Sequence, residues 1–183
     1  MRKIPTIFER DLSKSASGGL VVKGEPLVDL TGAVPTMKRD GMCVMVREGK
    51  LFKRHETYDK AKSPHFELVE ADETTGKAFG WLPVGEGPED KWFRSIPIPV
   101  DDGTYEFVGP KSQGNPHKFQ KHLFIKHGDE ELDRSVPTDF ASICGYLFMH
   151  EDMEGIVWWR AGQPIGKIKR RDFGLKWPAP NGG

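Results

Sequence analysis

The sequence has little cysteine and no clustered histidine, and both shortages exclude particular kinds of protein. Cys43 and Cys144 are the only two cysteines in 183 residues, and they form no CxxC motif. A disulfide framework or a structural zinc site is therefore not expected. The six histidines are scattered without the spacing of metal ligands. This cysteine usage fits a reducing compartment, so we expect a cytoplasmic protein, in the host cytoplasm if the source is viral.

Net charge and long apolar runs are also lacking. The 27 Lys and Arg residues balance 27 Asp and Glu residues, so the overall charge indicates no polyanionic partner. Local charge is uneven, because "GKIKRRDFGLK" is basic and "HGDEELD" is acidic. No apolar run is long enough to cross a membrane, and "MRKIPTIFERD" lacks the apolar core of a signal peptide. We expect no association with membranes.

The length and composition favour one domain over residues 1–183, with an irregular insertion at about 56–100. The insertion is rich in Pro, Gly, Glu, Asp and Lys, and we expect two short strands in it. We expect Trp81 and Trp92 to be isolated anchors within it. No internal repeat is visible.

Alternating patterns predict most of the secondary structure as strands. One helix is predicted in "PTDFASICGYLF", where Phe140, Ile143, Leu147 and Phe148 are expected on one face. The fold class is therefore α+β, with mostly strands and one or two helices. The predicted strands lie within "AVPTMKR", "MCVMVR", "KLFKRH" (after a turn at Glu48–Gly49), "GTYEFVG", "KHLFIKHG", "EGIVWWR" and "PIGKIKRR" (after a turn at 161–163).

Lys38, in the stretch "TMKRDGMCV", is a candidate nucleophile. A lysine amine attacks only when it is neutral, and at an ordinary pKa near ~10.4 about one in 2,500 is neutral at pH 7. Nearby cations or burial must therefore favour the neutral form. By itself, this stretch fits a solvated strand that runs into a turn better than it fits a catalytic site.

Further charged residues on strands could complete a site for such a lysine. Lys167 and Lys169 are two residues apart, so both project from one face of a strand, where a phosphate could lie between them. Glu106 lies inside the strand "TYEFVG", and Glu154 precedes an apolar strand. Considered one at a time, these charged residues also fit the solvent-exposed face of a strand.

The order of these stretches resembles the covalent lysine nucleotidyltransferases, which are the polynucleotide ligases and RNA capping enzymes. The resemblance spans about residues 30–175. Its glutamate motif, in the glutamate-first form "YEFVGPKSQGNP", resembles that of ATP-dependent RNA ligases. The opening "KIPTIFERD" and the stretch "EGIVWW…KIKRRDFG" further resemble small RNA ligases of animals and some viruses. The motifs that carry the resemblance are "KRDG" (38–41), "YEFVGPK" (105–111), "EGIV" (154–157) and "KIK" (167–169).

The resemblance implies a nucleotidyltransferase domain, unrelated to ATP-grasp proteins, in which two antiparallel sheets flank an ATP pocket. Few helices and no OB-fold domain are expected, because the chain ends soon after "KIKRRDFG". RNA binding would then use the domain surface, the insertion or another subunit. Trp81, Lys91 and Trp92 could contact single-stranded RNA, or the two tryptophans could fix an irregular loop to the core.

The resemblance also implies roles for individual residues. Lys38 would attack the α-phosphate of ATP to form a lysyl-AMP intermediate. Glu154 would hold Mg²⁺ or Mn²⁺ and orient Lys38. Lys167 and Lys169 would stabilise charge on the α-phosphate. Glu106 would bind the ribose hydroxyls.

Other residues would complete the nucleotide site. Asp40 and Gly41 would shape the turn after Lys38, and Arg54 would contact the nucleotide sugar or the substrate phosphate. Phe124 is the candidate for stacking on adenine, with Phe119 as the second choice.

The implied reaction transfers AMP to an RNA 5′-phosphate, and a 3′-hydroxyl then displaces AMP to form the phosphodiester. The acceptor could instead be DNA, or the enzyme could be a capping enzyme that uses GTP. Met42 and Cys43 disfavour both, because those enzymes carry an arginine soon after the K-x-D-G glycine. A nucleotide- or RNA-binding module without activity is a further alternative, although such a module needs no nucleophile. A monomer is expected.

Overall fold

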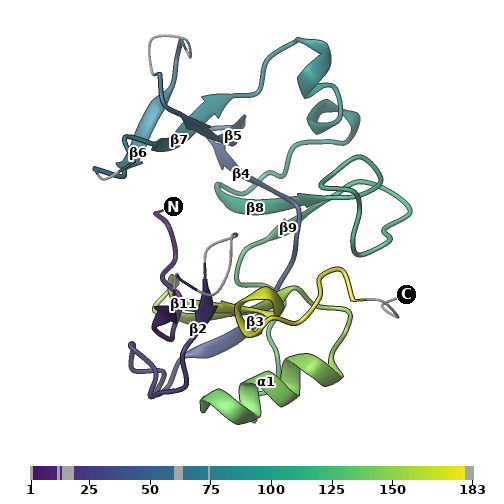
Figure 1. Ribbon diagram of the computed structural model, residues 1–183. Coiled ribbons are helices and arrows are strands. Elements are labelled where there is room, and N and C mark those ends of the chain that lie inside the picture. The colour runs from purple at the N-terminus through teal and green to yellow at the C-terminus, as the bar shows by residue number, and fades with distance from the viewer. Residues whose placement is uncertain (1, 12, 14–18, 60–63, 74, 180–183) are drawn as a thin grey trace. The chain divides into compact units, whose positions relative to one another are not determined.

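The computed structural model describes residues 2–11, 13, 19–59, 64–73 and 75–179, and these form two compact units (Figure 1). The first unit comprises Met1–Lys3 and Asp40–His127, and the second comprises Ile4–Arg39 and Gly128–Gly183. The boundary therefore falls inside the "KRDG" stretch, between Arg39 and Asp40. The described elements are mostly strands with one α-helix, whereas the single nucleotidyltransferase domain stays a prediction.

The first unit is built on a six-stranded antiparallel sheet in the order β6-β7-β5-β4-β8-β9 (Figure 1). Its strands lie where the sequence predicts them, including two in the 56–100 segment, and those two extend the sheet beyond β5. Two 3₁₀ turns, η3 (Pro88–Asp90) and η4 (Phe93–Ser95), precede β8. The strands are β4 (Met42–Arg47), β5 (Lys50–Thr57), β6 (Glu67–Ala71), β7 (Ala78–Pro83), β8 (Gly103–Val108) and β9 (Leu123–Lys126).

The predicted turn between β4 and β5 is confirmed. Arg47 pairs with Lys50, which leaves Glu48 and Gly49 as a two-residue turn. Both have positive φ angles, 52° and 70°, as a type I′ hairpin requires. This turn fixes the register that brings Val44 opposite Lys53.

Alternate residues of this sheet project to opposite faces, and one face carries an apolar cluster. Cys43 and Glu106, which are Cα partners, lie on the face opposite the apolar cluster. Trp81 is only 4% exposed, so its burial favours a core role over contact with RNA, whereas Trp92 is half-buried. The buried members of the cluster are Val44, Val46, Leu51, Phe93, Tyr105 and Phe107.

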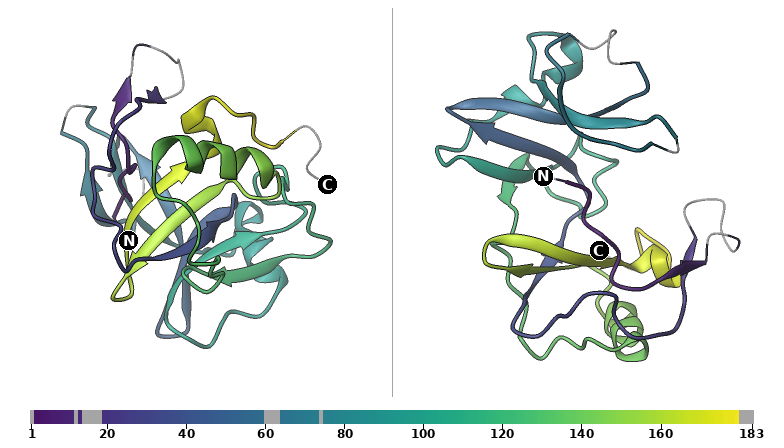
Figure 2. Two further views of the ribbon diagram at one scale, coloured as in Figure 1. Left: turned by 90° about the horizontal axis from the view of Figure 1, so that it is seen from below. Right: turned by 90° about the vertical axis from the view of Figure 1, so that its left-hand side faces the viewer.

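The second unit contains a three-stranded antiparallel sheet in the order β11-β10-β3. Its strands are β3 (Val34–Lys38), β10 (Gly155–Arg160) and β11 (Gln163–Lys169). A two-stranded ladder pairs β1 (Arg10–Asp11) with β2 (Leu20–Val21), and the 3₁₀ turn η5 spans Arg170–Phe173. Figure 2 shows helix α1 (Phe140–Met149) against one face of the three-stranded sheet. The predicted β10–β11 hairpin is confirmed, with Ala161 and Gly162 as its two turn residues.

Helix α1 packs through a narrower face than the sequence predicts. It begins after Asp139, whose side chain accepts a hydrogen bond from the Ser142 amide at 3.0 Å. Ile143 and Leu147 are fully buried, as predicted, but Phe148 is 59% exposed, so its place on the buried face is wrong. At about 100° of rotation per residue, Phe148 turns away from the sheet side that Leu147 occupies. None of the described helices combines the length and apolarity needed to cross a membrane.

Gly155 is required by the close pairing of β10 and β11. A Cβ there would overlap the Ile168 carbonyl oxygen and approach the Lys169 Cα to 2.9 Å. We expect Gly155→Ala to lower the free energy of unfolding by about 1–3 kcal/mol, as overpacking does. Gly145→Ala, on the exposed side of α1 where nothing lies within 4 Å of a Cβ, should instead raise it by about 0.5–1 kcal/mol. Urea denaturation of both variants tests this, and equal effects would contradict it.

Candidate active site

Lys38, Lys167 and Lys169 share one face of the β11-β10-β3 sheet. In the register of this sheet, Gly155 of β10 is the Cα partner of both Lys38 and Lys169. Met37 and Ile168, their neighbours in sequence, pack in the apolar cluster on the opposite face. Side chains alternate along a strand, so all three lysines project away from that cluster. The predicted shared face of Lys167 and Lys169 is confirmed.

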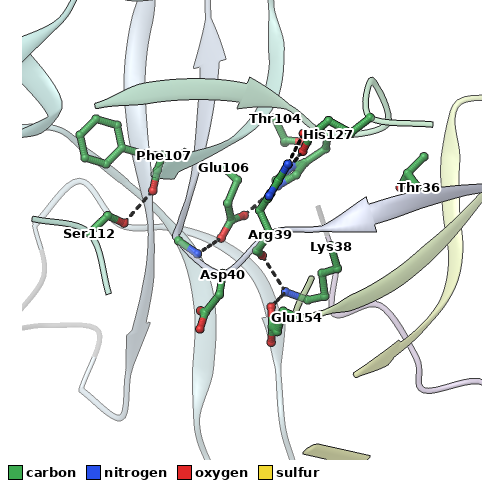
Figure 3. Close-up of polar contacts among 12 residues, drawn as sticks. Thr36, Lys38, Arg39, Asp40, Thr104, Glu106, Phe107, Ser112, His127 and Glu154 are labelled. Atoms are coloured by element: carbon green, nitrogen blue, oxygen red, sulfur yellow. Dashed lines mark hydrogen bonds and ion pairs between the residues drawn. The ribbon is translucent and has the colours of Figure 1, made fainter. Parts of the chain in front are cut away.

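Glu154 is the direct partner of Lys38 in this unit (Figure 3). Its Oε2 accepts a hydrogen bond from Lys38 Nζ at 2.5 Å, and Nζ also lies 3.2 Å from the Arg39 carbonyl oxygen. The Glu154 residue is only 7% exposed, so little water competes for the carboxylate. The contact orients Nζ and stabilises its charged form.

The environment of Lys167 disfavours its positive charge. Burial, reinforced by the ammonium groups of Lys38 and Lys169, lowers the pKa of Lys167 from its usual 10.5 to about 8. Glu154 and Asp172 act in the opposite direction but do not offset this. The positive charge of the three lysines exceeds the negative charge of these two carboxylates, which favours a bound anion.

Asp172 and Arg170 hold the end of β11 in place. Asp172 Oδ2 accepts a hydrogen bond from the Lys169 amide at 2.7 Å, and its Oδ1 pairs with Arg10. The buried Arg170 side chain donates to the carbonyl oxygens of Leu147, near the end of α1, and of Lys176. The sequence analysis missed both supporting residues, and their only signal was the basic run "KIKRRD".

The first unit orders a second set of predicted residues around Glu106 (Figure 3). Its Oε1 accepts a hydrogen bond from the Gly41 amide at 2.9 Å, and its Oε2 lies 2.9 Å from His127 Nε2. His127 Nδ1 is in turn 3.0 Å from Thr104 Oγ1. Glu106 is therefore fixed by two partners, the Gly41 amide and the His127 ring.

Two histidines that the sequence analysis missed support this set. His117 Nε2 accepts a hydrogen bond from the Asp40 amide at 2.9 Å, and His127 orients Glu106. Cys43, Glu106 and His127 also place one ligand atom each within 4.8 Å of one another, so they could hold a metal ion. Spacing in the sequence gives no sign of this group, because its members come from three different strands or strand ends.

Arg54 lies on β5, opposite Trp81 of the neighbouring strand. Its guanidinium carbon is 5.5 Å from the centroid of the Phe79 ring, a cation–π contact.

Phe124 and Glu106 lie on opposite faces of the sheet. Phe124 packs with Phe107, at 5.1 Å between ring centroids, and belongs to the apolar cluster of the sheet. Its neighbour Ile125 is the Cα partner of Glu106 and shares its face. Phe119, the second choice, lies 5.9 Å from the His117 ring.

Comparison with known families decides between the ligase classes. A family model described as RNA ligase 1 matches residues 83–182, more than half of the 183-residue chain. The chain belongs to the RNA ligase 1 family. The matched stretch of this RNA ligase 1 family member includes Glu106, Glu154, Lys167 and Lys169 and begins after Lys38. No match was found among curated proteins. Membership in this family indicates a ligase with an RNA substrate and favours that function over DNA sealing or capping.

Proposed function

We propose that this member of the RNA ligase 1 family is an ATP-dependent RNA ligase that works through a lysyl-AMP intermediate on Lys38. The observation that carries the proposal is the 2.5 Å contact between Lys38 and the buried Glu154. Lys167 and Lys169 extend from the same sheet face. A nucleophile, an orienting carboxylate and two cations for a phosphate are what nucleotidyl transfer to lysine needs.

In the first step, the neutral amine of Lys38 attacks the α-phosphorus of ATP. The Nζ–P bond forms while the bond from phosphorus to the bridging oxygen breaks, so pyrophosphate leaves with that electron pair and Nζ gives up a proton. Negative charge grows on the phosphate oxygens and the leaving group. Lys167 and Lys169 stabilise this charge more strongly in the transition state than in the resting state.

Glu154 suits a second role as ligand for Mg²⁺ or Mn²⁺. A buried carboxylate whose described partner is an ammonium group offers the hard oxygen that these ions prefer. When bound, such an ion would supply positive charge to the triphosphate, and Glu154 would then stabilise the charged form of Lys38 less strongly. Glu154 itself keeps Nζ aimed along the path of attack.

The residues whose proposed role is to bind the nucleoside belong to the first unit. Glu106, held by Gly41 and His127, would accept hydrogen bonds from the ribose hydroxyls. Asp40 follows Lys38 in the chain and is fixed by His117, and Arg54 would contact the sugar or the substrate phosphate. For the adenine ring, Ile125 is a better candidate than Phe124, since it shares the face of Glu106.

The later steps join RNA ends. AMP moves from Lys38 to an RNA 5′-phosphate, and the 3′-hydroxyl of the second end attacks that phosphate and releases AMP. A monomer acting in the cytoplasm stays a prediction.

Ligation assays with RNA and DNA strands that differ in their 5′ ends test the proposed function. With ATP and Mg²⁺, we expect 5′-phosphorylated RNA to be joined or circularised, with matched 5′-hydroxyl RNA inert and DNA of the same sequence at least about tenfold slower. Gel analysis of labelled strands measures this. Equal sealing of nicked DNA, or equal use of GTP, would reject the assignment.

A further inference from the structure

All the charged residues in the loop between β8 and β9 are basic. Residues 109–122, "GPKSQGNPHKFQKH", include no Asp or Glu. The overall charge of the chain is zero, so this is a strong local concentration. Its basic and titratable residues are Lys111, His117, Lys118, Lys121 and His122.

Hydrogen bonds and close packing give this loop a defined shape. A Cβ on Gly109 would meet the His122 Cα at 2.7 Å, so the two ends of the loop lie against each other. The Lys111 amide donates to His122 Nε2 at 3.2 Å. Within the loop, the Asn115 side chain bonds both the amide and the carbonyl of Phe119, at 2.9 and 3.0 Å. The loop therefore presents its lysines from an ordered backbone.

Aromatic rings meet at the base of the loop. The His122 ring stacks on Phe107, with centroids 5.0 Å apart and planes 23° apart, and lies 5.5 Å from the Trp92 ring. Burial lowers the pKa of His122, so near pH 7 it acts as a neutral aromatic ring. Lys91 Nζ lies 4.7 Å from the centroid of the half-buried Trp92. Cationic and aromatic groups are thus interleaved.

The lysines around these rings are available for an anionic partner. Lys91, Lys111 and Lys121 are exposed, and within the described part of the chain none forms a salt bridge with a carboxylate. Elsewhere in the same unit, Lys53 pairs with Asp90 and Lys77 pairs with Glu56.

We propose that the basic–aromatic patch of Lys91, Trp92, Lys111, Lys121 and His122 binds the single-stranded RNA substrate. This inference rests on the proposed function, because it names where the RNA of that reaction is held. Lysines can neutralise successive phosphates while the edge or face of Trp92 meets a base, a combination that binds single strands with little sequence preference. His117 connects the same loop to the Asp40 amide beside the nucleophile motif. A site for free phosphate alone would need no aromatic ring.

A charge-matched pair of triple variants tests the patch. The patch variant carries Lys91→Gln, Lys111→Gln and Lys121→Gln. The control carries Lys23→Gln, Lys50→Gln and Lys176→Gln, at lysines that are also exposed. Fluorescence anisotropy with a labelled, 5′-phosphorylated single-stranded RNA of about 20 nucleotides, without ATP, measures affinity over a salt series. If all three lysines contact phosphates, the patch variant should bind at least about tenfold more weakly, with a salt slope reduced by about 2. The control should stay within about twofold of wild type.

Adenylation by labelled ATP separates this inference from the proposed function. The patch variant should keep wild-type adenylation and lose RNA joining. An equal loss of RNA affinity in the patch variant and the control variant would contradict RNA binding at this patch. Loss of adenylation in the patch variant would contradict it too. Trp92→Leu should weaken RNA binding without changing the salt slope. An unchanged affinity would show that Trp92 does not contact a base. If wild type is not adenylated, the proposed function fails, while the RNA-binding comparison still decides the patch.

Discussion

Lys38→Ala is expected to abolish the covalent AMP that wild type acquires from α-labelled ATP and Mg²⁺. The label should fall by at least about 10³-fold, because no other group replaces a missing nucleophile. In wild type the label should survive denaturation and be released by acid, as a phosphoramidate is. Gel autoradiography after denaturation measures both properties.

A second variant separates loss of the nucleophile from loss of a partner for Glu154. Alanine leaves the buried carboxylate without the Lys38 ammonium, which could itself destabilise the protein. Lys38→Arg keeps a cation beside Glu154, but a guanidinium stays protonated and does not attack. Both variants should lack the label, while Lys50→Ala, at an exposed lysine, should retain it. Undiminished label in Lys38→Arg with an intact circular dichroism spectrum would reject the mechanism.

Lys167→Met is expected to change activity and stability in opposite directions. Adenylation should fall by about 10²–10³-fold, the usual effect of removing one group that stabilises transition-state charge. The apo protein should become more stable, because wild type holds a lysine whose pKa burial and two neighbouring cations lower to about 8. Allowing for solvent screening, the gain near pH 7 should be about 1–3 kcal/mol.

The pH dependence of that gain has a definite sign. Between about pH 8 and 10.5 the unfolded chain still binds the Lys167 proton and the folded protein does not. Wild-type stability therefore rises with pH in this window relative to the variant, and the advantage of Lys167→Met should shrink. Urea denaturation at pH 7 and pH 9.5, with Lys50→Met as the control, measures it. A variant less stable than wild type at pH 7 would show that Lys167 is a structural residue.

Local patterns predicted much of the fold. The turns predicted at Glu48–Gly49 and at 161–163 marked two hairpins because each contains a glycine, which readily adopts a positive φ angle. Ile143 and Leu147 marked the buried side of α1. Phe148 was misplaced because it lies at the edge of the helical face, where the packing of neighbouring elements decides.

The site was predicted less completely, because its geometry depends on long-range register. The order of motifs indicated Lys38 and Glu154, but nothing local shows that Gly155 pairs with Lys38 across more than a hundred residues. Register also decides which residue of β9 shares a face with Glu106, because a shift of one position reverses the face of a strand residue. Ile125 shares that face, whereas Phe124, the residue predicted to stack on adenine, lies on the other.

The residues that support the site through hydrogen bonds were the hardest to predict from the sequence. His117, His127 and Asp172 support Asp40, Glu106 and Lys169, respectively, through side-chain hydrogen bonds. Such bonds leave no periodic pattern in a sequence, so they emerge only when the strands are paired.

The site of adenylation tests the central claim most directly. Wild-type protein incubated with ATP and Mg²⁺ would be measured as intact protein by mass spectrometry, then digested at neutral or alkaline pH and mapped. The account predicts one AMP per chain, on the peptide that contains Lys38. An AMP on any other lysine, or no covalent AMP, would contradict it.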